Sequence, residues 1–341
     1  MCGIVCAVAQ REVREILLEG LKRLEYRGYD SAGMVTVSPE RDRLQVVKSI
    51  GKVAELVNAT KRKKATGRIG LAHTRWATHG KPTKANAHPH VSGSEIAVVH
   101  NGIIENYEAL RSGLKKKGYK FLSDTDTEIV AHAIHFYRSQ HKSSLLQAVK
   151  GVTKDLYGAF GLCVLDKRNP DQIIAARSGS PLVIGVGIGE NFVASDPVAL
   201  GQVTDRFIYL EEGDIASISL SEVSIWNKSR RVQRVVTTIP RNSSESDKGK
   251  FQHFMLKEIY EQPTSIRETL IGRISKTKVL EQAFGLNAGK IFNKVKHVQI
   301  VACGTSYHAG LIAKYWLESV AKMSCQVDIA SDYRYLSLIH I

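Results

Sequence analysis

The sequence lacks several features that would place it in a specialised class of protein. Nowhere in its 341 residues is there an apolar run of the ~18–20 residues that a membrane-spanning helix needs. The five cysteines, at positions 2, 6, 163, 303 and 325, are odd in number and scattered. They therefore argue against a disulfide framework and predict a reducing, cytoplasmic location.

A metal-binding pattern is also missing from the sequence. The 12 histidines form no HExxH motif, and the cysteines form no Cys-x-x-Cys pair. Residues 86–90 (NAHPH) bring two histidines close together, but the proline between them breaks the helical spacing that two ligands would need. We therefore predict no metal site.

The charge balance is unequal but does not point to nucleic acid. Lys and Arg number 48 against 33 Asp and Glu, which gives a formal net charge of +15. The basic clusters at 61–64 and 115–117 are short and carry no interleaved aromatic residues on which bases could stack. We predict a solvated surface, with no nucleic-acid partner and no membrane partner, on a protein whose small substrates carry negative groups.

The pattern of apolar residues up to about position 240 predicts an α+β domain built in layers. The composition, with 43% hydrophobic and 24% charged residues, is that of an ordinary globular protein, and the length fits about two domains. Short strand-like segments alternate with turns and with a few clustered helices. The predicted helices are 11–24, 105–117 and 127–138, and the predicted strands are 3–9, 32–37, 44–48, 69–72, 96–100, 158–166, 173–177, 182–186, 191–194, 207–210 and 215–219.

The composition changes near residue 240. Residues 241–250 (RNSSESDKGK) are polar and small, and they predict a linker between a domain of residues 1–240 and a second domain of residues 251–341. The second domain begins with a predicted helix at 251–270, in which Pro263 marks a break or a new first turn.

The rest of the second domain reads as a βαβ unit of a parallel sheet. The predicted order is a strand at 297–302, a turn at 303–306, a helix at 307–320 and a strand at 325–330. Two parallel strands cannot make a sheet that is buried on both faces. We therefore expect the chain to be part of something longer, with this domain truncated.

Candidate chemistry begins at Cys2, directly after Met1. A small second residue favours removal of the initiator methionine, which would leave a cysteine at the N-terminus. Its α-amine, with a pKa near ~7.7–8.0, would be partly free base at neutral pH and could take the thiol proton directly or through a water. Taken alone, Cys2 could equally be a small residue that starts a strand.

Five segments give this cysteine a specific context. They are 1–5 (MCGIV), 26–33 (YRGYDSAG), 73–80 (HTRWATHG), 100–106 (HNGIIEN) and 125–128 (TDTE). Their combination resembles the N-terminal-nucleophile glutaminase domain of the class II glutamine amidotransferases, which implies an αββα sandwich. With 176–182 (ARSGSPL) and 257–263 (KEIYEQP), the chain more narrowly resembles the glutamine–fructose-6-phosphate aminotransferases, which are isomerising glucosamine-6-phosphate synthases.

This resemblance implies a catalytic role for three residues. Cys2 would attack the side-chain amide of L-glutamine and form a glutamyl thioester, which water hydrolyses to glutamate. The side-chain amide of Asn101 and the backbone N–H of Gly102 would form the oxyanion hole, because two donors aimed at the developing charge stabilise the transition state. The alternative for the Asn-Gly pair is a tight turn, which this dipeptide also favours.

The resemblance also implies a binding site for glutamine. Arg75 would hold the carboxylate through its planar fork, and Asp126 would hold the α-ammonium. Trp76 would gate an ammonia channel, and Thr78 and His79 would line the pocket. The alternatives are a surface ion pair for Arg75, a helix N-cap for Asp126 and a core aromatic for Trp76.

Other residues near these motifs are expected to support the site rather than react. We assign this role to Arg27 and Asp30, and a structural role to His88, His90 and His100. Cys6 occupies a place where the family usually has glycine. On a strand its side chain would share a face with that of Cys2, so a disulfide or metal pair is conceivable, but a small buried thiol is the better interpretation.

The motif at 303–307 (CGTSY) resembles the first sugar-phosphate loop of the sugar isomerase (SIS) domain. By this resemblance Thr305 and Ser306 would contact fructose 6-phosphate or glucosamine 6-phosphate, since helix N-termini and hydroxyls donate to phosphate. The alternative is ordinary N-capping. The family pattern fades after 332–334, so we expect this chain to run at most the glutaminase half of the reaction.

The resemblance implies L-glutamine and fructose 6-phosphate as substrates, no cofactor, and a homodimer for the full-length protein. Two rival interpretations remain at this point. One is another class II glutamine amidotransferase, such as the amidophosphoribosyl- or asparagine-forming type. The other is a non-enzymatic SIS module that senses sugar phosphates.

Overall fold

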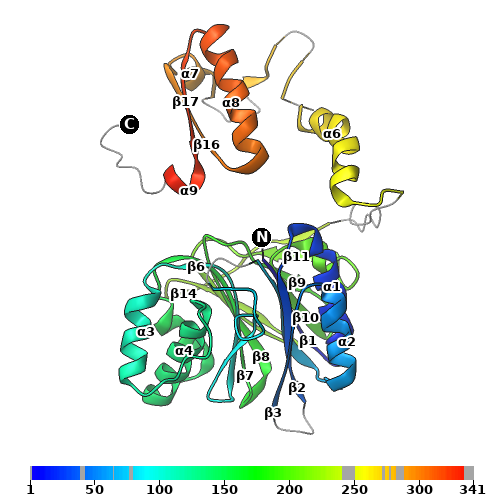
Figure 1. Ribbon diagram of the computed structural model, residues 1–341, viewed down its shortest axis with the longest axis vertical. Coiled ribbons are helices and arrows are strands. Elements are labelled where there is room, and N and C mark those ends of the chain that lie inside the picture. The colour runs from blue at the N-terminus through cyan, green and yellow to red at the C-terminus, as the bar shows by residue number, and fades with distance from the viewer. Residues whose placement is uncertain are drawn as a thin grey trace. The chain divides into compact units, whose positions relative to one another are not determined.

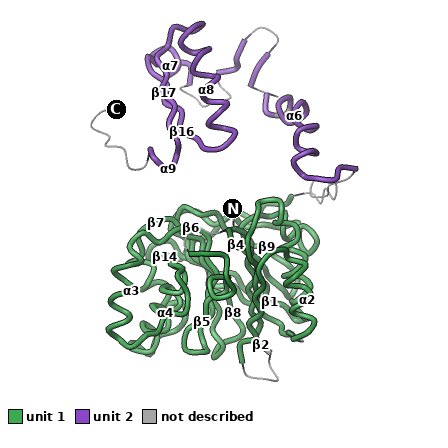
Figure 2. The backbone as a smooth tube through the Cα atoms, viewed as in Figure 1, with its two compact units in different colours: residues 1–249 green, residues 250–341 purple. Residues whose placement is uncertain are grey.

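The computed structural model describes residues 2–38, 43–63, 65–76, 80–239, 250–270, 273–275, 278–281 and 288–333. The chain divides into two compact units, Met1–Gly249 and Lys250–Ile341 (Figure 2). Of the predicted linker at 241–250, only Lys250 is among the described residues, so its structure stays a prediction.

Two antiparallel sheets lie face to face at the centre of the first unit (Figure 1). The eight-stranded sheet has the order β15-β11-β9-β10-β1-β4-β2-β3. Its strands are β1 (Gly3–Ala9), β2 (Ser31–Ser38), β3 (Arg43–Ile50), β4 (Ile69–Arg75), β9 (Val183–Val186), β10 (Glu190–Ala194), β11 (Arg206–Tyr209) and β15 (Val236–Thr238).

The second sheet of this unit has seven strands in the order β14-β13-β12-β8-β7-β6-β5. Its strands are β5 (His90–Ser92), β6 (Ile96–Ile104), β7 (Gly158–Asp166), β8 (Asn169–Ser178), β12 (Asp214–Ser219), β13 (Val223–Asn227) and β14 (Arg230–Val232). The longest ladder is β6 on β7, where Asn101 pairs with Gly161. Asn101 of this sheet hydrogen-bonds Cys2, the residue before β1 of the other sheet, so the two sheets meet there.

Helices cover the outer face of each sheet (Figure 1). On the eight-stranded sheet lie α1 (Arg14–Arg23) and α2 (Val53–Lys63), and on the seven-stranded sheet lie α3 (Tyr107–Lys116), α4 (Thr127–His141) and α5 (Leu145–Val152). Two short 3₁₀ helices span Glu25–Arg27 and Pro197–Leu200. The predicted αββα sandwich is confirmed.

Alternation along β1 explains how a wholly apolar strand serves two cores. Val5, Ala7 and Ala9 pack under the helices, whereas Ile4, Cys6 and Val8 pack between the sheets. Successive side chains of a strand point to opposite faces, so a strand that is covered on both sides reads as a continuous apolar run. The unbroken apolar run of β1 is therefore consistent with its central position in the sheet.

Two helices of the first unit were not predicted. The last turn of α2 contains Lys61, Arg62 and Lys63, whose positive charges lie near the negative end of the helix dipole. In α5 the signal was present: Ser144 accepts from the backbone N–H of Gln147, and the Gln147 side chain accepts from the Ser144 N–H. This capping box is a known mark of a helix start.

The second unit, taken by itself, contains the predicted βαβ arrangement. Its helices are α6 (Phe254–Leu270), α7 (Ala288–Phe292), α8 (Gly304–Ser319) and α9 (Ala330–Tyr333), and its strands β16 (His297–Ala302) and β17 (Ser324–Ile329) pair in parallel. Gly310 of α8 packs against Ile300 of β16 and Val327 of β17. The βαβ prediction is confirmed.

Two local predictions for this unit are wrong. The predicted break at Pro263 is absent, because α6 continues through that residue from Phe254 to Leu270. A proline removes one backbone donor and disfavours a helix interior without excluding it. The helix predicted to begin at Tyr307 begins at Gly304, whose positive φ of 59° lets the chain turn directly out of β16.

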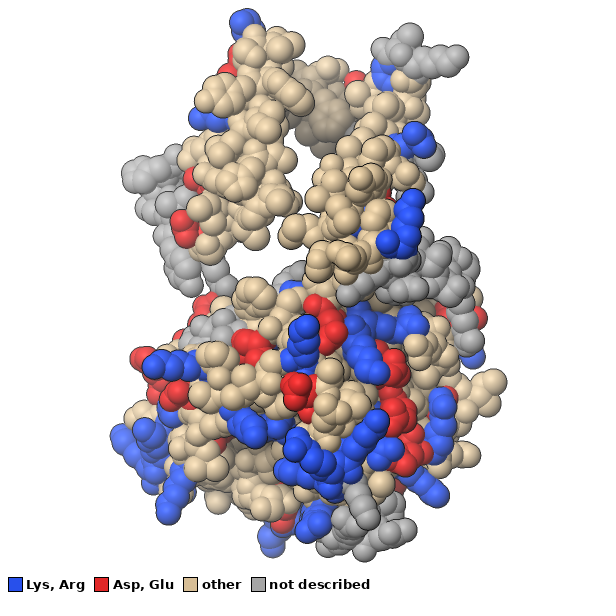
Figure 3. Space-filling view, turned by 45° about the vertical axis from the view of Figure 1, so that its right-hand side comes forward, with Lys and Arg blue, Asp and Glu red and all other residues tan. Residues whose placement is uncertain are grey.

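On one face of the molecule (Figure 3), charged side chains of both signs share the surface of the first unit. On the face shown in Figure 3, the Lys and Arg side chains of the first unit are spread over the surface with Asp and Glu among them. In the part of the chain that the structure describes, no helix has the length and apolar character needed to cross a membrane.

Candidate active site

Cys2 directly precedes β1, a central strand of the eight-stranded sheet. The backbone N–H of Trp76 donates to its Sγ atom over 3.1 Å, and the thiol lies 3.4 Å from the carbonyl oxygen of Trp76. Burial raises the pKa of the Cys2 thiol, and the Trp76 N–H acts in the opposite direction. The thiol is therefore mainly protonated at neutral pH and needs a base to become a nucleophile.

Asn101 and Gly102 come from the other sheet. Both lie inside β6, so the alternative of a tight turn is wrong. The side-chain amide nitrogen of Asn101 donates to the carbonyl oxygen of Cys2 over 3.2 Å. Gly102 has a φ of 125°, and a Cβ atom there would lie 2.0 Å from the carbonyl oxygen of Ala159. Only glycine fits this backbone.

Arg75 ends β4 and is buried, with 3% of its surface exposed, so it does not form a surface ion pair. Its guanidinium donates to the carbonyl oxygens of Gly80 and Lys81 over 3.1 and 3.3 Å. It also lies 3.6 Å from a carboxylate oxygen of Asp30. In this structure the Arg75 guanidinium is therefore held by backbone carbonyl oxygens of the segment that follows β4.

Asp126 precedes α4 but its side chain makes no capping hydrogen bond to that helix. One carboxylate oxygen instead accepts from the backbone N–H of Ile104 over 2.9 Å, at the end of β6. The residue is buried, with 4% exposed. Asp126 thus stands at the N-cap position without making the capping bond. Its carboxylate instead binds the backbone of β6, the strand that carries Asn101.

One small pocket joins most of the predicted residues. It is lined by Cys2, Arg75, Trp76, Gly102 and Asp126, together with His88, His100, Thr125 and Thr127. Asn101 is not among the lining residues, but its side-chain amide hydrogen-bonds the backbone of Cys2, which is. The predicted pocket residues Thr78 and His79 lie outside the described residues.

Trp76 is not a core aromatic, because 53% of its surface is exposed. Its ring lies over the loop before β2, where a Cβ atom on Gly28 would come within 2.4 Å of the ring carbon Cζ3. Gly28 has a φ of 80°. This close approach places the indole beside the pocket while its backbone holds the thiol.

The residues expected to support the site do so in different ways. Arg27 forms an ion pair with Asp196 and donates to Tyr26. Asp30 accepts from Ser31 over 2.8 Å, and its backbone N–H donates to the carbonyl oxygen of Arg75 over 2.7 Å. These contacts fix the loop on which the Trp76 ring rests.

The three histidines given a structural role are buried. His88 and His100 both hydrogen-bond the hydroxyl of Thr127, over 2.8 and 2.9 Å, and His90 bonds Thr125 over 3.0 Å. Burial lowers the pKa of His88 and of His90 well below the usual value. His88 and His90 therefore hold the segment around Asp126 as neutral groups.

Sequence reasoning missed a further histidine. His73 of β4 lies with Nε2 3.0 Å from Oδ1 of Asn101 and 3.0 Å from the carbonyl oxygen of His100. It stands in the motif at 73–80, two residues before Arg75. Even spacing on a strand puts it on the same face as Arg75, which was the available signal.

Cys6 is a fully buried free thiol in the core between the sheets. Burial raises its pKa well above the usual value, and its side chain hydrogen-bonds that of Cys163. The interpretation of Cys6 as a small buried thiol is confirmed. Among the described residues there is no group of three or more His, Cys, Asp or Glu that could hold a metal ion.

Thr305 and Ser306 lie in the first turn of α8, where both are exposed. Cys303 occupies the N-cap position and makes no side-chain capping bond. The structure by itself assigns these hydroxyls no ligand, so their role stays a prediction.

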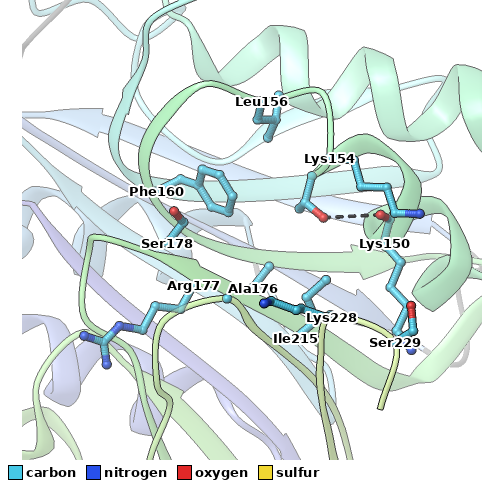
Figure 4. A pocket seen from close by; sticks show the side chains of 12 residues that line it. Lys150, Lys154, Leu156, Phe160, Ala176, Arg177, Ser178, Ile215, Lys228 and Ser229 are labelled. Atoms are coloured by element: carbon cyan, nitrogen blue, oxygen red, sulfur yellow. Dashed lines mark hydrogen bonds between the residues drawn. The ribbon is translucent and has the colours of Figure 1, made fainter. Parts of the chain in front are cut away.

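A second pocket of the first unit contains none of the predicted site residues (Figure 4). It lies between the end of α5 and the turn that joins β13 to β14. Its lining includes Lys150, Phe160 and Lys228. The Lys150 ammonium lies 4.1 Å from the ring centre of Trp226, so this cation is already engaged.

Comparisons with known proteins agree with this geometry. Residues 73–202 match the family described as a glutamine amidotransferase domain, and residues 291–341 match the SIS domain family. The glutamine–fructose-6-phosphate aminotransferase (isomerising) of Pseudomonas putida is 56% identical over 340 residues, which are 99% of this chain and 55% of that protein. The chain belongs to the family of the glutamine–fructose-6-phosphate aminotransferases.

Other relatives in this family agree. The enzyme of the same name from Idiomarina loihiensis is 57% identical over 336 residues, covering 98% of this chain and 55% of that protein. That of Vibrio vulnificus is 54% identical over 340 residues, with 99% and 55% covered. The chain thus spans about 55% of the length of the curated aminotransferases it matches.

Two solved structures share the fold. An allosteric regulatory enzyme of purine biosynthesis is 27% identical, with a TM-score of 0.58 over 67% of this chain and 49% of that one. A glutamine phosphoribosylpyrophosphate amidotransferase from B. subtilis is 21% identical, with a TM-score of 0.60 over 96% of this chain and 65% of that one. The identities near 56% in the aminotransferase family decide against this rival, and the glutamine amidotransferase domain decides against a mere SIS module.

Proposed function

We propose that the first unit hydrolyses L-glutamine with Cys2 as the nucleophile. The observation that supports this proposal most strongly is that residues of both sheets lie together around the Cys2 thiol. The Cys2 carbonyl oxygen accepts from the Asn101 amide of β6, and the same pocket is lined by a buried arginine and a buried aspartate, Arg75 and Asp126. A nucleophile, an amide donor and two opposite charges suit an amino acid that is attacked at its side chain.

The reaction begins when Sγ of Cys2 attacks the side-chain carbonyl carbon of glutamine. The carbonyl oxygen becomes an oxyanion and is stabilised by the Asn101 amide and the backbone N–H of Gly102. The amide nitrogen then takes a proton and leaves as ammonia, which leaves a glutamyl thioester. Water adds to the thioester carbonyl, and the bond to sulfur breaks to give glutamate and the free thiol.

The base that takes the proton of the Cys2 thiol during its attack is the α-amine of Cys2, once Met1 has been removed. The buried histidines around the pocket are poor bases, because burial lowers the pKa of His73 to about 3 and that of His88 well below its usual value. An α-amine titrates near ~7.7–8.0, so part of it accepts protons at neutral pH. It belongs to the same residue as the thiol, which makes the transfer local.

Glutamine binding requires a rearrangement of Arg75. Its guanidinium now donates to the carbonyl oxygens of Gly80 and Lys81. A carboxylate is a better acceptor than a neutral carbonyl, and it can take two parallel N–H bonds from one guanidinium. The substrate carboxylate therefore exchanges with the loop carbonyls, and the Asp126 carboxylate receives the α-ammonium.

The whole protein would pass this ammonia to fructose 6-phosphate and isomerise the product to glucosamine 6-phosphate. Membership of the aminotransferase family supports this reaction, as does the match to a SIS domain at 291–341. Thr305 and Ser306, in the first turn of α8, would contact the sugar phosphate through their hydroxyls. The proposal includes no cofactor, a cytoplasmic location, a homodimer for the full-length protein, and Trp76 as the gate of the ammonia path.

A paired substitution tests the nucleophile. Cys2→Ala removes the thiol and should abolish glutamate release from glutamine, whereas Cys303→Ala, which removes an exposed thiol of the second unit, should leave it unchanged. Glutamate is measured with a coupled dehydrogenase. Turnover in Cys2→Ala comparable with that of the unmodified chain would refute the proposal.

A further inference from the structure

The ring of His73 reaches from one sheet to the other. His73 belongs to β4 of the eight-stranded sheet, and its Nε2 atom lies 3.0 Å from two acceptors on β6, the carbonyl oxygen of His100 and Oδ1 of Asn101. The ring packs against that of His88, with ring centres 4.1 Å apart and the two planes tilted by 34°. His88 is itself held by Thr127. The imidazole is therefore fixed on its edge and on its face.

The position of the His73 proton follows from these contacts. A backbone carbonyl oxygen can only accept, so the contact with His100 requires the proton on Nε2. Burial lowers the pKa of His73 to about 3, and the ring is therefore neutral at pH 7 with a single proton. The other nitrogen, Nδ1, is buried and has no hydrogen-bond partner among the described residues. Among the described residues, no acceptor near Nδ1 would favour the tautomer with the proton on that nitrogen.

The same proton determines how the Asn101 amide is turned. Because Nε2 donates, the atom of Asn101 that faces it must be the acceptor Oδ1. The nitrogen Nδ2 then faces the other way, where it donates to the carbonyl oxygen of Cys2 over 3.2 Å. An amide nitrogen carries two protons, so a second N–H remains for a ligand beside the nucleophile. A half-turn of this amide would aim an oxygen at the reacting carbonyl instead.

We propose that His73 is a positioning residue, whose Nε2–H fixes the side-chain amide of Asn101 with its nitrogen toward Cys2. This inference rests on the proposed glutaminase function. His73 touches neither the substrate nor the thiol, and it acts only through Asn101. Its removal should therefore cost as much as the loss of one oxyanion-hole donor, about 10²–10³-fold in kcat.

Two substitutions separate the donor from the volume of the ring. His73→Phe keeps an aromatic ring but removes the donor, and should lower kcat for glutamine hydrolysis about 10²–10³-fold with KM little changed, because the lost interaction forms only in the transition state. His73→Gln supplies an N–H at a similar place and should recover most of the rate. A His73→Phe variant with unchanged kcat would overturn the proposal.

Two controls detect a merely structural effect. His132→Phe alters another buried histidine, which bonds Ser92 over 2.8 Å and has no contact with Cys2 or Asn101, and should keep kcat. Alkylation of Cys2 by iodoacetamide builds no oxyanion, so its rate should be the same in His73→Phe as in the unmodified chain. An equal loss of alkylation and turnover in His73→Phe would show a distorted site and contradict the proposal.

A spectroscopic measurement decides the tautomer without any variant. Nitrogen-15 NMR of the histidine-labelled chain should show His73 at pH 7 as a neutral ring with its proton on Nε2. A proton on Nδ1 would overturn the proposal. If the unmodified chain fails to hydrolyse glutamine, the proposed function fails, while the NMR result still reports on His73 alone.

Discussion

The side-chain amide of Asn101 donates to the backbone carbonyl oxygen of Cys2 over 3.2 Å, which links the two sheets at the point where the chain begins. Each sheet is packed on both faces, so this contact ties Cys2 to the packed interior of the first unit. A free N-terminus would otherwise be poorly ordered.

Gly102→Ala should inactivate the glutaminase and destabilise the first unit. The φ of 125° disfavours any side chain, and the new Cβ would lie 2.0 Å from the carbonyl oxygen of Ala159, so β6 must move. Gly113→Ala is the matched control, since Gly113 lies in α3 with no atom within 4 Å of a Cβ there. It should stabilise the fold by about 0.5–1 kcal/mol. Thermal unfolding and glutamate release measure both, and an active Gly102→Ala enzyme would contradict the geometry.

Gly28→Ala should impair catalysis by displacing Trp76. The new Cβ would come 2.4 Å from the indole ring, and the backbone of the same tryptophan holds the Cys2 thiol. A misplacement of about 1 Å in an active site can cost about 10²-fold in rate. Gly51→Ala introduces similar backbone strain, with a φ of 86° against 80°, but its Cβ meets nothing within 4 Å. Kinetics of the two variants should differ sharply, and equal rates would show that the Trp76 ring is not required in its present place.

Arg75→Lys should raise KM for glutamine with little change in kcat. A lysine keeps the charge but loses the planar fork that binds a carboxylate through two parallel bonds. The loss of one charge-assisted hydrogen bond, at about 1.5–3 kcal/mol, corresponds to roughly a tenfold or greater increase in KM. Steady-state kinetics measure the split. A fall in kcat at unchanged KM would mean that Arg75 acts in the chemical step rather than in binding.

The first unit should lose stability progressively as the pH falls below about 6.5. Burial holds the pKa of His73 at about 3 in the folded chain, whereas an unfolded histidine titrates near 6.5, so the unfolded state binds more protons between these values. His73→Gln should therefore reduce the slope of unfolding free energy against pH by up to about 1.4 kcal/mol per pH unit in that window. Urea unfolding at a series of pH values measures the slope, and identical slopes would show that His73 is protonated in the fold.

Glu128 should add to the acid sensitivity at lower pH. Its burial by itself raises the pKa, but hydrogen bonds from His132, Leu122 and Ser123 outweigh this effect and hold the pKa at about 2. The stabilisation is complete above the unfolded pKa of about 4.3 and is lost as the pH falls toward 2. Glu128→Gln should lower stability at pH 7 and flatten the profile between these values. An unchanged profile would place the acid-sensitive carboxylate elsewhere.

The sequence predicted the layered α+β fold because apolar residues recur along it with the spacing expected of buried strands and of helices with one buried face. The short apolar run at 3–9 predicted a buried strand, and β1 is buried, with side chains in a core on each of its two faces. What the sequence could not provide was the pairing across the two sheets. Cys2 and Asn101 are brought together only by packing over long sequence distance, so their proximity came from resemblance and not from local pattern.

At single residues, the alternatives that local pattern suggested gave way to tertiary contacts. Asn101-Gly102 carries turn chemistry but lies in a strand, because the ladder with β7 overrides the local preference. Asp126 has the sequence of an N-cap but gives its carboxylate to Ile104 of β6. His73 went unnoticed because its importance depends on which acceptors the facing sheet presents. In each case a tertiary contact replaced a local one.

The central claim is that Cys2, freed at the N-terminus, forms the covalent bond to the substrate. The most direct test is acid-quenched mass spectrometry of the chain during glutamine turnover. The account predicts a first peptide that begins at Cys2, without Met1, and carries a glutamyl group on its sulfur. Steady glutamate release from a chain that keeps Met1 and shows no adduct on Cys2 would contradict it.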